Sequence, residues 1–208
     1  MIDPRKFWNT SYAQSALNNK KPIKNYWLER WQEILNEKHE GKAILELGCG
    51  CGHDSTYLAR LGYNVTATDF SEEALKICHQ LAPSVTHLQV DVRQPLPFPN
   101  NSFYFVVASL SLHYFSWQQT KAIEKEIRRC LKNKGVFFVR LNSTNDTNYG
   151  AVGHKEIEPN FYLVNGIQKR FFDRDSIDTL FNEAWQFLGI EEMIVGKKVL
   201  WEIILKKR

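Results

Sequence analysis

The sequence predicts an α/β fold in which helices cover both faces of a mostly parallel sheet, and two observations carry this prediction. From Ala43 onward, short apolar segments alternate with segments of helical period, as expected for parallel strands joined by helical crossovers. The last two apolar segments, 190–195 and 199–205, are separated by three residues, which can join only antiparallel strands. The sheet should therefore end in one reversed strand.

The first forty residues predict an N-terminal helical cover. Apolar side chains there share one helical face that would pack onto the rest of the protein, namely Trp27, Leu28, Trp31, Ile34 and Leu35. No internal repeat or change of composition marks a second domain. We expect a single domain over 1–208, with the cover over 1–40 and an α/β core over 41–208.

The individual core elements are predicted by the same alternation of short apolar segments with segments of helical period. Strands are expected over 43–47, 65–68, 85–90, 103–109 and 136–141, and helices from 54, from 72 and over 121–131. Ser71 followed by Glu72 and Glu73 indicates a helix start, because a serine hydroxyl caps free amides and acids favour the positive end of the helix dipole.

After Leu141 the alternation stops for about twenty-five residues, which is more often a functional lid than a plain linker. We therefore expect a lid loop over about 142–170. A further helix is indicated by five apolar residues with helical spacing: Ile177, Leu180, Phe181, Ala184 and Leu188.

The chain has 27 basic and 23 acidic side chains and a net charge of +4. Five of the basic side chains and one acid lie in the last twelve residues, so the rest of the chain carries no net charge. We interpret this terminal run as a solvated tail first and an anion-attracting patch second. Nucleic acid is not an expected partner, because following its phosphates requires basic side chains clustered over a face of the body.

Membrane insertion and export are not expected. The best apolar stretch, 103–115, is thirteen residues long and is interrupted by serines and a histidine. The start, MIDPRKFWNT, lacks the apolar segment of a signal peptide. We therefore expect a cytoplasmic protein whose four cysteines are thiols.

The strongest functional signal is the sequence ILELGCGCG at 44–52, in which an apolar strand runs into glycines at alternate positions. Glycine permits a sharp turn and lets a ligand approach the backbone at the sheet edge where α/β proteins bind ligands. A nucleotide-like cofactor is therefore expected. The dinucleotide fingerprint fails in its last element, because the third glycine would fall at His53.

These residues resemble the first motif of the Rossmann-like, class I S-adenosylmethionine-dependent methyltransferases, in which an acid in the strand end, here Glu46, precedes a Gly-x-Gly-x-Gly loop. The resemblance continues in order through 65–71, 90–92, 103–115 and the turn at 133–136. It covers residues 40–141 well and the remainder at the level of topology. It implies a three-layer sandwich around a seven-stranded, mostly parallel sheet with an antiparallel last strand.

The resemblance also implies how the cofactor is held. Asp69 would accept both ribose hydroxyls, Asp91 would accept the adenine amino group beside the backbone of Val92, and Glu46 would lie near the cationic methionine end. The implied cofactor-binding residues are Trp8, Tyr12, Glu46, Gly48, Cys49, Gly50, Gly52, Asp69, Phe70, Asp91, Val92 and Ser109. For Asp69 and Asp91, capping of the following segments is the alternative.

The segment 54–69 is similar to the small-molecule branch of this class, which includes tellurite-resistance and thiopurine methyltransferases. In that branch an aromatic N-terminal segment folds over the cofactor, which would make Trp8 and Tyr12 a cover. The alternative, that both rings only pack in the core, stays open.

Cys49, Cys51 and His53 form a Cys-x-Cys-x-His sequence that could be read as metal ligands. No second cluster in the sequence completes a tetrahedral site, and the glycine loop is assigned to the cofactor. No metal is expected.

His113 follows the fourth strand, where this class places residues that face the substrate. It is the candidate general base, and a hydrogen-bonded structural histidine is the alternative. Within the expected lid, 142–150 and 169–172 are candidates for contact with the acceptor. Lys169 or Arg170 could favour an anionic acceptor, whereas as surface residues they would carry no functional meaning.

The sequence thus predicts methyl transfer from S-adenosylmethionine to a small-molecule acceptor, with S-adenosylhomocysteine as the product. Two alternatives stay open, an RNA or protein methyltransferase and a cofactor-binding module without activity. Against the first, strand four ends in residues 109–112, SLSL, which lack the Asn/Asp-Pro-Pro-aromatic signature of base amino-methyltransferases. Against the second, the glycines and carboxylates are intact. Neither the acceptor nor the oligomeric state is indicated.

Overall fold

The computed structural model describes residues 3–17, 27–36 and 43–208. Its main sheet has seven strands in the order β3-β2-β1-β4-β5-β10-β9. The bounds are β1 (Ala43–Leu47), β2 (Asn64–Asp69), β3 (Thr86–Gln89), β4 (Phe103–Ser109), β5 (Leu131–Asn142), β9 (Trp185–Val195) and β10 (Lys198–Lys207). β10 is antiparallel to both of its neighbours, whereas β1 to β5 pair in parallel. The predicted fold class and the reversed last strand are confirmed.

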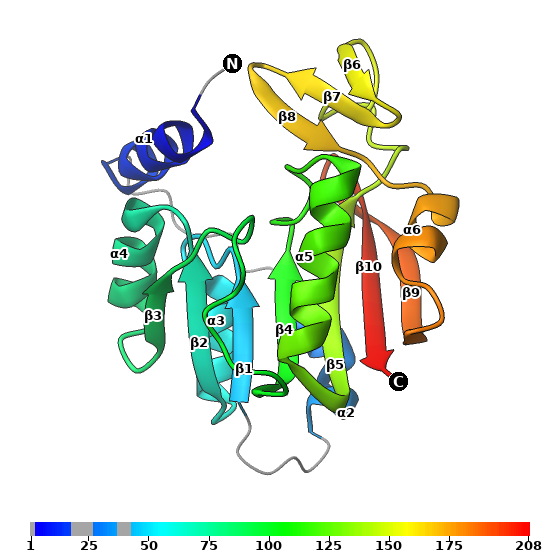
Figure 1. Ribbon diagram of the computed structural model, residues 1–208. Coiled ribbons are helices and arrows are strands. Elements are labelled where there is room, and N and C mark those ends of the chain that lie inside the picture. Colours follow the sequence, from blue (N-terminus) through cyan, green and yellow to red (C-terminus); the bar gives the residue numbers. More distant parts are fainter. Residues whose placement is uncertain (1–2, 18–26, 37–42) are drawn as a thin grey trace.

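Helices pack on both faces of this sheet, as the alternation of side chains along the strands requires. On one face α5 (Trp117–Cys130) and α6 (Arg174–Leu180) cover an apolar core that includes Leu45, Phe137 and Val139. On the other, α3 (His53–Arg60), α4 (Glu72–Leu81), the 3-10 helix η1 (Trp27–Trp31) and α2 (Gln32–Leu35) cover a second core that includes Ile44 and Phe138. Figure 1 shows the resulting three layers.

The helix starts agree with local capping chemistry. Ser71 precedes α4, and its hydroxyl accepts a hydrogen bond of 3.2 Å from the amide of Ala74, as predicted. The helix expected over 121–131 begins earlier, at Trp117, because Ser116 and Gln119 form a reciprocal capping box there.

The stretch expected as a lid loop is largely a second, three-stranded antiparallel sheet of β6 (Lys155–Glu158), β7 (Phe161–Val164) and β8 (Ile167–Arg170). The expectation of a loop was therefore wrong over this part. The strands are four residues each, too short to show a clear period. In Figure 1 this small sheet lies on the same side of the molecule as α1 (Pro4–Leu17).

The helix expected to include Ala184 and Leu188 was also wrong in its second half. α6 ends at Leu180, and residues from Trp185 onward belong to β9. Residues Trp185 to Val195 pair with β10, and the Trp185 indole is buried against Phe137 and Phe181. This tertiary structure overrides the helical spacing of the apolar residues.

Four of the five cations near the C-terminus lie in strand β10 or in the turn before it, and only Arg208 follows the strand, so the interpretation of the run as a tail was wrong. Lys207 donates hydrogen bonds to the carbonyl of Leu131 at 2.7 Å and to the side chain of Asn101 at 3.1 Å. Lys198, at the other end of β10, is half-buried.

Of the predicted N-terminal cover over 1–40, residues 1–2, 18–26 and 37–40 lie outside the described residues. In the described part, α1 is tied to the loop before α4, where the Ser71 hydroxyl donates a 2.6 Å hydrogen bond to the Asn9 side chain. Trp31 packs against β9 so closely that a Cβ at Gly189 would lie 2.4 Å from its ring. In the part of the chain that the structure describes, no helix is long and apolar enough to cross a membrane.

Candidate active site

A cavity of about 410 Å³ lies at the carboxyl ends of the parallel strands. The strand order reverses direction between β1 and β4, with β2 and β3 on one side and β5 on the other. Such a switch point leaves a crevice outside the strand ends, and ligands of open α/β sheets bind there. The predicted glycine loop follows β1 and lies in this crevice.

The glycine loop adopts backbone angles that only glycine takes easily. Gly48 and Gly50 have φ of 73° and 52°, and a Cβ at Gly48 would lie 2.4 Å from the Cβ of Ser111. The Ser111 hydroxyl in turn donates a 2.6 Å hydrogen bond to the carbonyl of Leu47. The chain leaving β4 is therefore fixed directly against the loop that leaves β1.

Glu46 is a buried carboxylate, 3% exposed, that lines the cavity. It accepts a hydrogen bond from the Ser55 hydroxyl. Burial, together with the charge of Asp54, raises the pKa of Glu46 well above its usual value. A carboxylate in this position is stabilised by a cation brought into the cavity, which fits the ammonium group of the cofactor implied by the sequence.

Asp69, at the end of β2, holds the glycine loop. Its carboxylate accepts hydrogen bonds from the amides of Gly50 at 3.0 Å and Ser71 at 2.9 Å, and burial raises its pKa. Each oxygen retains a further lone pair, so the carboxylate can accept two hydroxyl donors from the cavity side. The contact with Ser71 shows that Asp69 also caps the segment that follows it, which was the alternative role considered for this residue.

Asp91 also lines the cavity, but its carboxylate is already engaged. Arg93 donates to both oxygens, with Nη2 2.6 Å from Oδ2 and Nε 2.9 Å from Oδ1. This bidentate pair lowers the pKa of Asp91. An adenine amino group at this place would share the carboxylate with Arg93, which the sequence did not indicate.

Two segments outside the main sheet line the cavity. α1 contributes Trp8 and Tyr12, whose rings lie 5.8 Å apart, and Trp8 packs edge-on against Tyr114 at 5.4 Å. The turn between β7 and β8 contributes Gly166, and β8 contributes Ile167. Both α1 rings are half-buried and line the open space, which favours the cover over the core alternative.

The structure brings most of the predicted cofactor-binding residues into this one cavity. Its walls include Trp8, Tyr12, Glu46, Gly48, Cys49, Gly50, Asp69, Phe70, Asp91, Val92 and Ser109. Gly52 does not line the cavity. It is the residue before α3, with φ of 83°, and a Cβ there would lie 2.5 Å from Cys78 Sγ, so close packing of α3 on α4 explains this glycine.

His113 does not line the cavity, although its neighbours Leu112 and Tyr114 do. The ring is 2% exposed and its Nδ1 makes no hydrogen bond to any described residue. Burial, with the charges of Lys198 and Lys169, holds the pKa of His113 well below its usual value. The ring is neutral at physiological pH, and its role as a general base stays a prediction.

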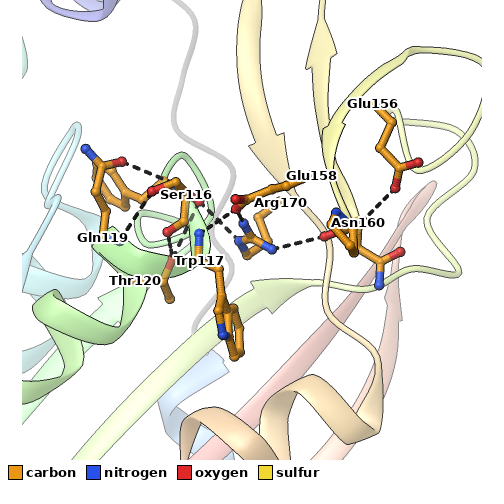
Figure 2. A network of polar contacts seen from close by, with 10 residues as sticks. Ser116, Trp117, Gln119, Thr120, Glu156, Glu158, Asn160 and Arg170 are labelled. Carbon is orange, nitrogen blue, oxygen red and sulfur yellow. Dashed lines mark hydrogen bonds and ion pairs between the residues drawn. The ribbon is translucent and has the colours of Figure 1, made fainter.

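Arg170, one of the two cations considered for an anionic acceptor, is buried at 4% exposure and does not line the cavity. It pairs with Glu158, which also accepts a 2.5 Å hydrogen bond from the amide of Trp117. Figure 2 shows this network between the small sheet and the start of α5. Burial lowers the pKa of Arg170 to about 10. Arg170 is thus neither a surface residue nor a cavity residue, and it joins β8 to α5.

The cavity wall also contains residues that the sequence did not assign to the site, among them Trp27, Asp54 and Arg140. The Trp27 indole donates a 2.9 Å hydrogen bond to Asp54, and Arg140 lies over the Trp27 ring at 5.3 Å from its centre. Burial raises the pKa of Asp54 to about 6. No local pattern marks these residues, because they come from η1, α3 and β5 and meet only in the folded chain.

Leu110 was missed as well. It leaves β4 with φ of 55°, a left-handed conformation that costs a leucine on the order of 1–3 kcal/mol and tends to occur at functional sites. Leu110 lines the cavity next to Ser109 and Ser111. This strained turn directs the chain that follows β4 along the cavity.

All four cysteines are free thiols, and Cys49 and Cys78 are buried. Over residues 3–17, 27–36 and 43–208, no group of three His, Cys, Asp or Glu side chains is arranged to hold a metal ion. The Cys-x-Cys-x-His sequence therefore gains no further ligand among these residues.

Residues 44–135, which contain the glycine loop and all three strand-end acids, match the model of a family described as "Methyltransferase domain". An uncharacterized methyltransferase of Synechocystis sp. is 34% identical over 97 residues, 47% of this chain and 45% of its own length. Phosphoethanolamine N-methyltransferase 3 of Arabidopsis thaliana is 30% identical over 132 residues, 59% of this chain and 26% of its own length.

A solved structure of an S-adenosylmethionine-dependent methyltransferase from Methanosarcina mazei superposes with a TM-score of 0.72 over 84% of this chain and 96% of that one, at 23% identity, which shows the fold. The fold and the matched segment are similar to those of the class I S-adenosylmethionine-dependent methyltransferases. The chain spans about half the length of the first curated relatives that it matches, for example 45% and 43%.

Proposed function

We propose that the protein transfers a methyl group from S-adenosylmethionine to a small-molecule acceptor that binds beside it in the same cavity. The observation that supports this most is the convergence of Glu46, Asp69 and Asp91, at or next to the ends of three neighbouring strands, on one cavity. Its volume of about 410 Å³ lies in the range of roughly 300–1,000 Å³ for small-molecule sites.

The donor groups of the cofactor match these acids in chemistry and in order. We assign its ammonium group to Glu46, its ribose hydroxyls to Asp69 and its adenine amino group to Asp91, with Phe70 and Val92 against the ring. Glu46 and Asp69 are carboxylates with raised pKa values, and each gains from hydrogen-bond donors or positive charge brought into the cavity.

When bound, S-adenosylmethionine supplies an electrophilic methyl carbon. In the transfer, the carbon–sulfur bond breaks as the bond to the acceptor forms, the electron pair goes to sulfur, and a neutral acceptor loses its proton to water or to a base. The chain contributes alignment and the exclusion of water, for which Trp8, Tyr12 and Tyr114 form the cover. A thiolate acceptor needs no base, and for oxygen or nitrogen His113 is the predicted one.

A small acceptor is favoured because residues of α1 and of the β7–β8 hairpin line the cavity in addition to those of the main sheet. One of the relatives is named for phosphoethanolamine, itself a small molecule. We also infer a cytoplasmic location, which is supported by the four free thiols.

The test is transfer of labelled methyl from S-adenosylmethionine to three fractions of a cell extract: small molecules, RNA and protein. We expect label in the small-molecule fraction, and an Asp69→Ala variant that does not label it. Label only in RNA or protein would contradict the small acceptor. No label in any fraction, with S-adenosylhomocysteine still bound, would indicate the module without activity.

A further inference from the structure

Arg140 is the one charged side chain of the cavity wall that has no hydrogen-bond partner among the described residues. The other charged residues of that wall are all engaged: Glu46 by Ser55, Asp54 by Trp27, Asp69 by two amides, and Asp91 and Arg93 by each other. Arg140 is 6% exposed, and its buried Nε has no partner in the part of the chain that the structure describes.

The acids nearest to Arg140 act on it through charge alone. Burial lowers the pKa of Arg140, and the charges of Asp54 and Glu202 partly oppose this. Asp54 accepts from the Trp27 indole, and Glu202 accepts from Arg30 at 2.9 Å. A buried guanidinium offers five N–H donors in a planar fork, and leaving them unbonded is costly.

The position of Arg140 places it on the acceptor side of the cofactor. In the sheet register Glu46 lies opposite Val107 of β4, and Arg140 of β5 lies opposite Ser109, two residues further along the same strand. Alternation along β4 puts Val107 and Ser109 on one face, so Glu46 and Arg140 lie on that face too, with β4 between them. A group held by Arg140 is therefore beside the methionine end of the cofactor, away from Asp69 and Asp91.

The surroundings add further positive charge. Burial lowers the pKa of Lys198, and the charges of Lys169 and Arg140 lower it further, so Lys198 lies near both of these cations. Lys169 follows Gln168, which lines the cavity. Asp146 is the acid that faces both lysines, and its two buried oxygens accept no well-formed hydrogen bond from any described residue.

We propose that Arg140 binds an anionic group, a carboxylate or a phosphate, of the methyl acceptor. This rests on the proposed function. The planar fork of arginine pairs with both oxygens of such a group and fixes its orientation, and the Trp27 ring lies against one side of the guanidinium. The acceptor is then held by its anionic end at Arg140 while its nucleophile faces the methyl group. The carboxylate of the cofactor shares this chemistry and is the competing source.

Calorimetric titration separates the two sources. Wild type, Arg140→Gln and Arg140→Lys are first titrated with S-adenosylhomocysteine. Each protein is then saturated with S-adenosylhomocysteine and titrated with benzoate, with phenyl phosphate and with benzamide, the neutral isostere of benzoate. We expect Arg140→Gln to bind S-adenosylhomocysteine within about twofold of wild type and to lose at least tenfold in affinity for one of the two anions. Arg140→Lys keeps the positive charge but lacks the planar guanidinium, so its affinity for the anion should lie between those of wild type and Arg140→Gln. Arg128→Gln, outside the cavity, is the matched control.

A measurement on wild type alone guards against variants that fold poorly. The Nε–H resonance of Arg140 should shift when benzoate or phenyl phosphate is added to the loaded protein and stay in place with benzamide. Equal binding of anions and benzamide overturns the inference. The inference is also overturned if Arg140→Gln loses affinity for S-adenosylhomocysteine but binds an analogue without the carboxylate as well as wild type does. Arg140 would then bind the carboxylate of the cofactor. Wild type that binds no S-adenosylhomocysteine overturns the proposed function itself.

Discussion

The amide of Gly50 donates a 3.0 Å hydrogen bond to the carboxylate of Asp69. The first of these residues belongs to the loop after β1 and the second ends β2, so one contact joins the two motifs that the sequence singled out separately. The same carboxylate accepts the Ser71 amide before α4. Asp69 therefore shapes the glycine loop in addition to its proposed role toward the ribose.

Asp69→Ala should weaken binding of S-adenosylhomocysteine by at least tenfold, because the ribose hydroxyls lose their acceptor and the Gly50 amide is released. The two freed amides should also lower the free energy of unfolding by about 1–3 kcal/mol. Calorimetry and urea unfolding measure the two effects. Asp178→Ala, which removes an exposed acid paired with Arg174 on α6, should change the affinity little. Unchanged affinity in Asp69→Ala would contradict the ribose assignment.

Gly50→Ala should be destabilising for two separable reasons. The φ of 52° costs an alanine roughly 1–2 kcal/mol, and its Cβ would lie 2.8 Å from the Tyr12 hydroxyl. Tyr12→Phe removes that oxygen, so in a double-mutant cycle it should recover part of the loss and leave the backbone strain. Thermal unfolding of the four proteins measures this. If the effects of the two substitutions on stability simply add, α1 does not lie over the glycine loop.

Much of the fold follows from the sequence because the core strands are apolar and their ends carry marked turn chemistry. The order of the Rossmann-like elements, the Ser71 cap and the reversed β10 follow from local patterns. The small sheet was missed although Asn165 and Gly166, both with positive φ, join β7 to β8. An Asn-Gly pair is a strong hairpin signal, but the strand that follows it, Ile167–Arg170, contains only one apolar residue.

The cavity was predictable only in part. The glycines and acids lie at strand ends, which a linear pattern marks, and the structure brings them together. Arg140 and Trp27 meet through packing of η1 on the sheet, and no spacing in the sequence indicates this contact. His113 was selected for its chemistry and position, but which way the side chain points depends on the backbone turn that Leu110 begins.

The stability of the protein should depend on the protonation of His113 in acid. Its pKa in the folded state is well below the usual value of 6.5, so the unfolded chain binds more protons in this range. The stabilising contribution is complete above pH 6.5 and is lost as the pH falls below it. Relative to His113→Asn, wild type should lose up to about 1.4 kcal/mol per pH unit in urea unfolding between pH 6.5 and 5. A difference that stays constant with pH would contradict the buried, neutral ring.

Glu158→Ala should loosen the small sheet, because it leaves the Arg170 guanidinium and the Trp117 amide without their shared acceptor. We expect a loss of about 1–3 kcal/mol in the free energy of unfolding and faster amide exchange in β7 and β8. Glu156→Ala removes an exposed acid of the same strand that accepts the amide of Asn160 at 3.0 Å and bonds the Tyr162 side chain, and it should cost less than half as much. Equal effects would mean that the pair of Glu158 and Arg170 does not hold the sheet.

The central claim is that the cavity binds S-adenosylmethionine through the glycine loop and the strand-end acids. Calorimetric titration of the wild-type protein with S-adenosylhomocysteine, and separately with NADH, tests it most directly. The account predicts one S-adenosylhomocysteine bound per chain, with a matching rise in the unfolding temperature, and no response to NADH. Binding of NADH without binding of S-adenosylhomocysteine would contradict it.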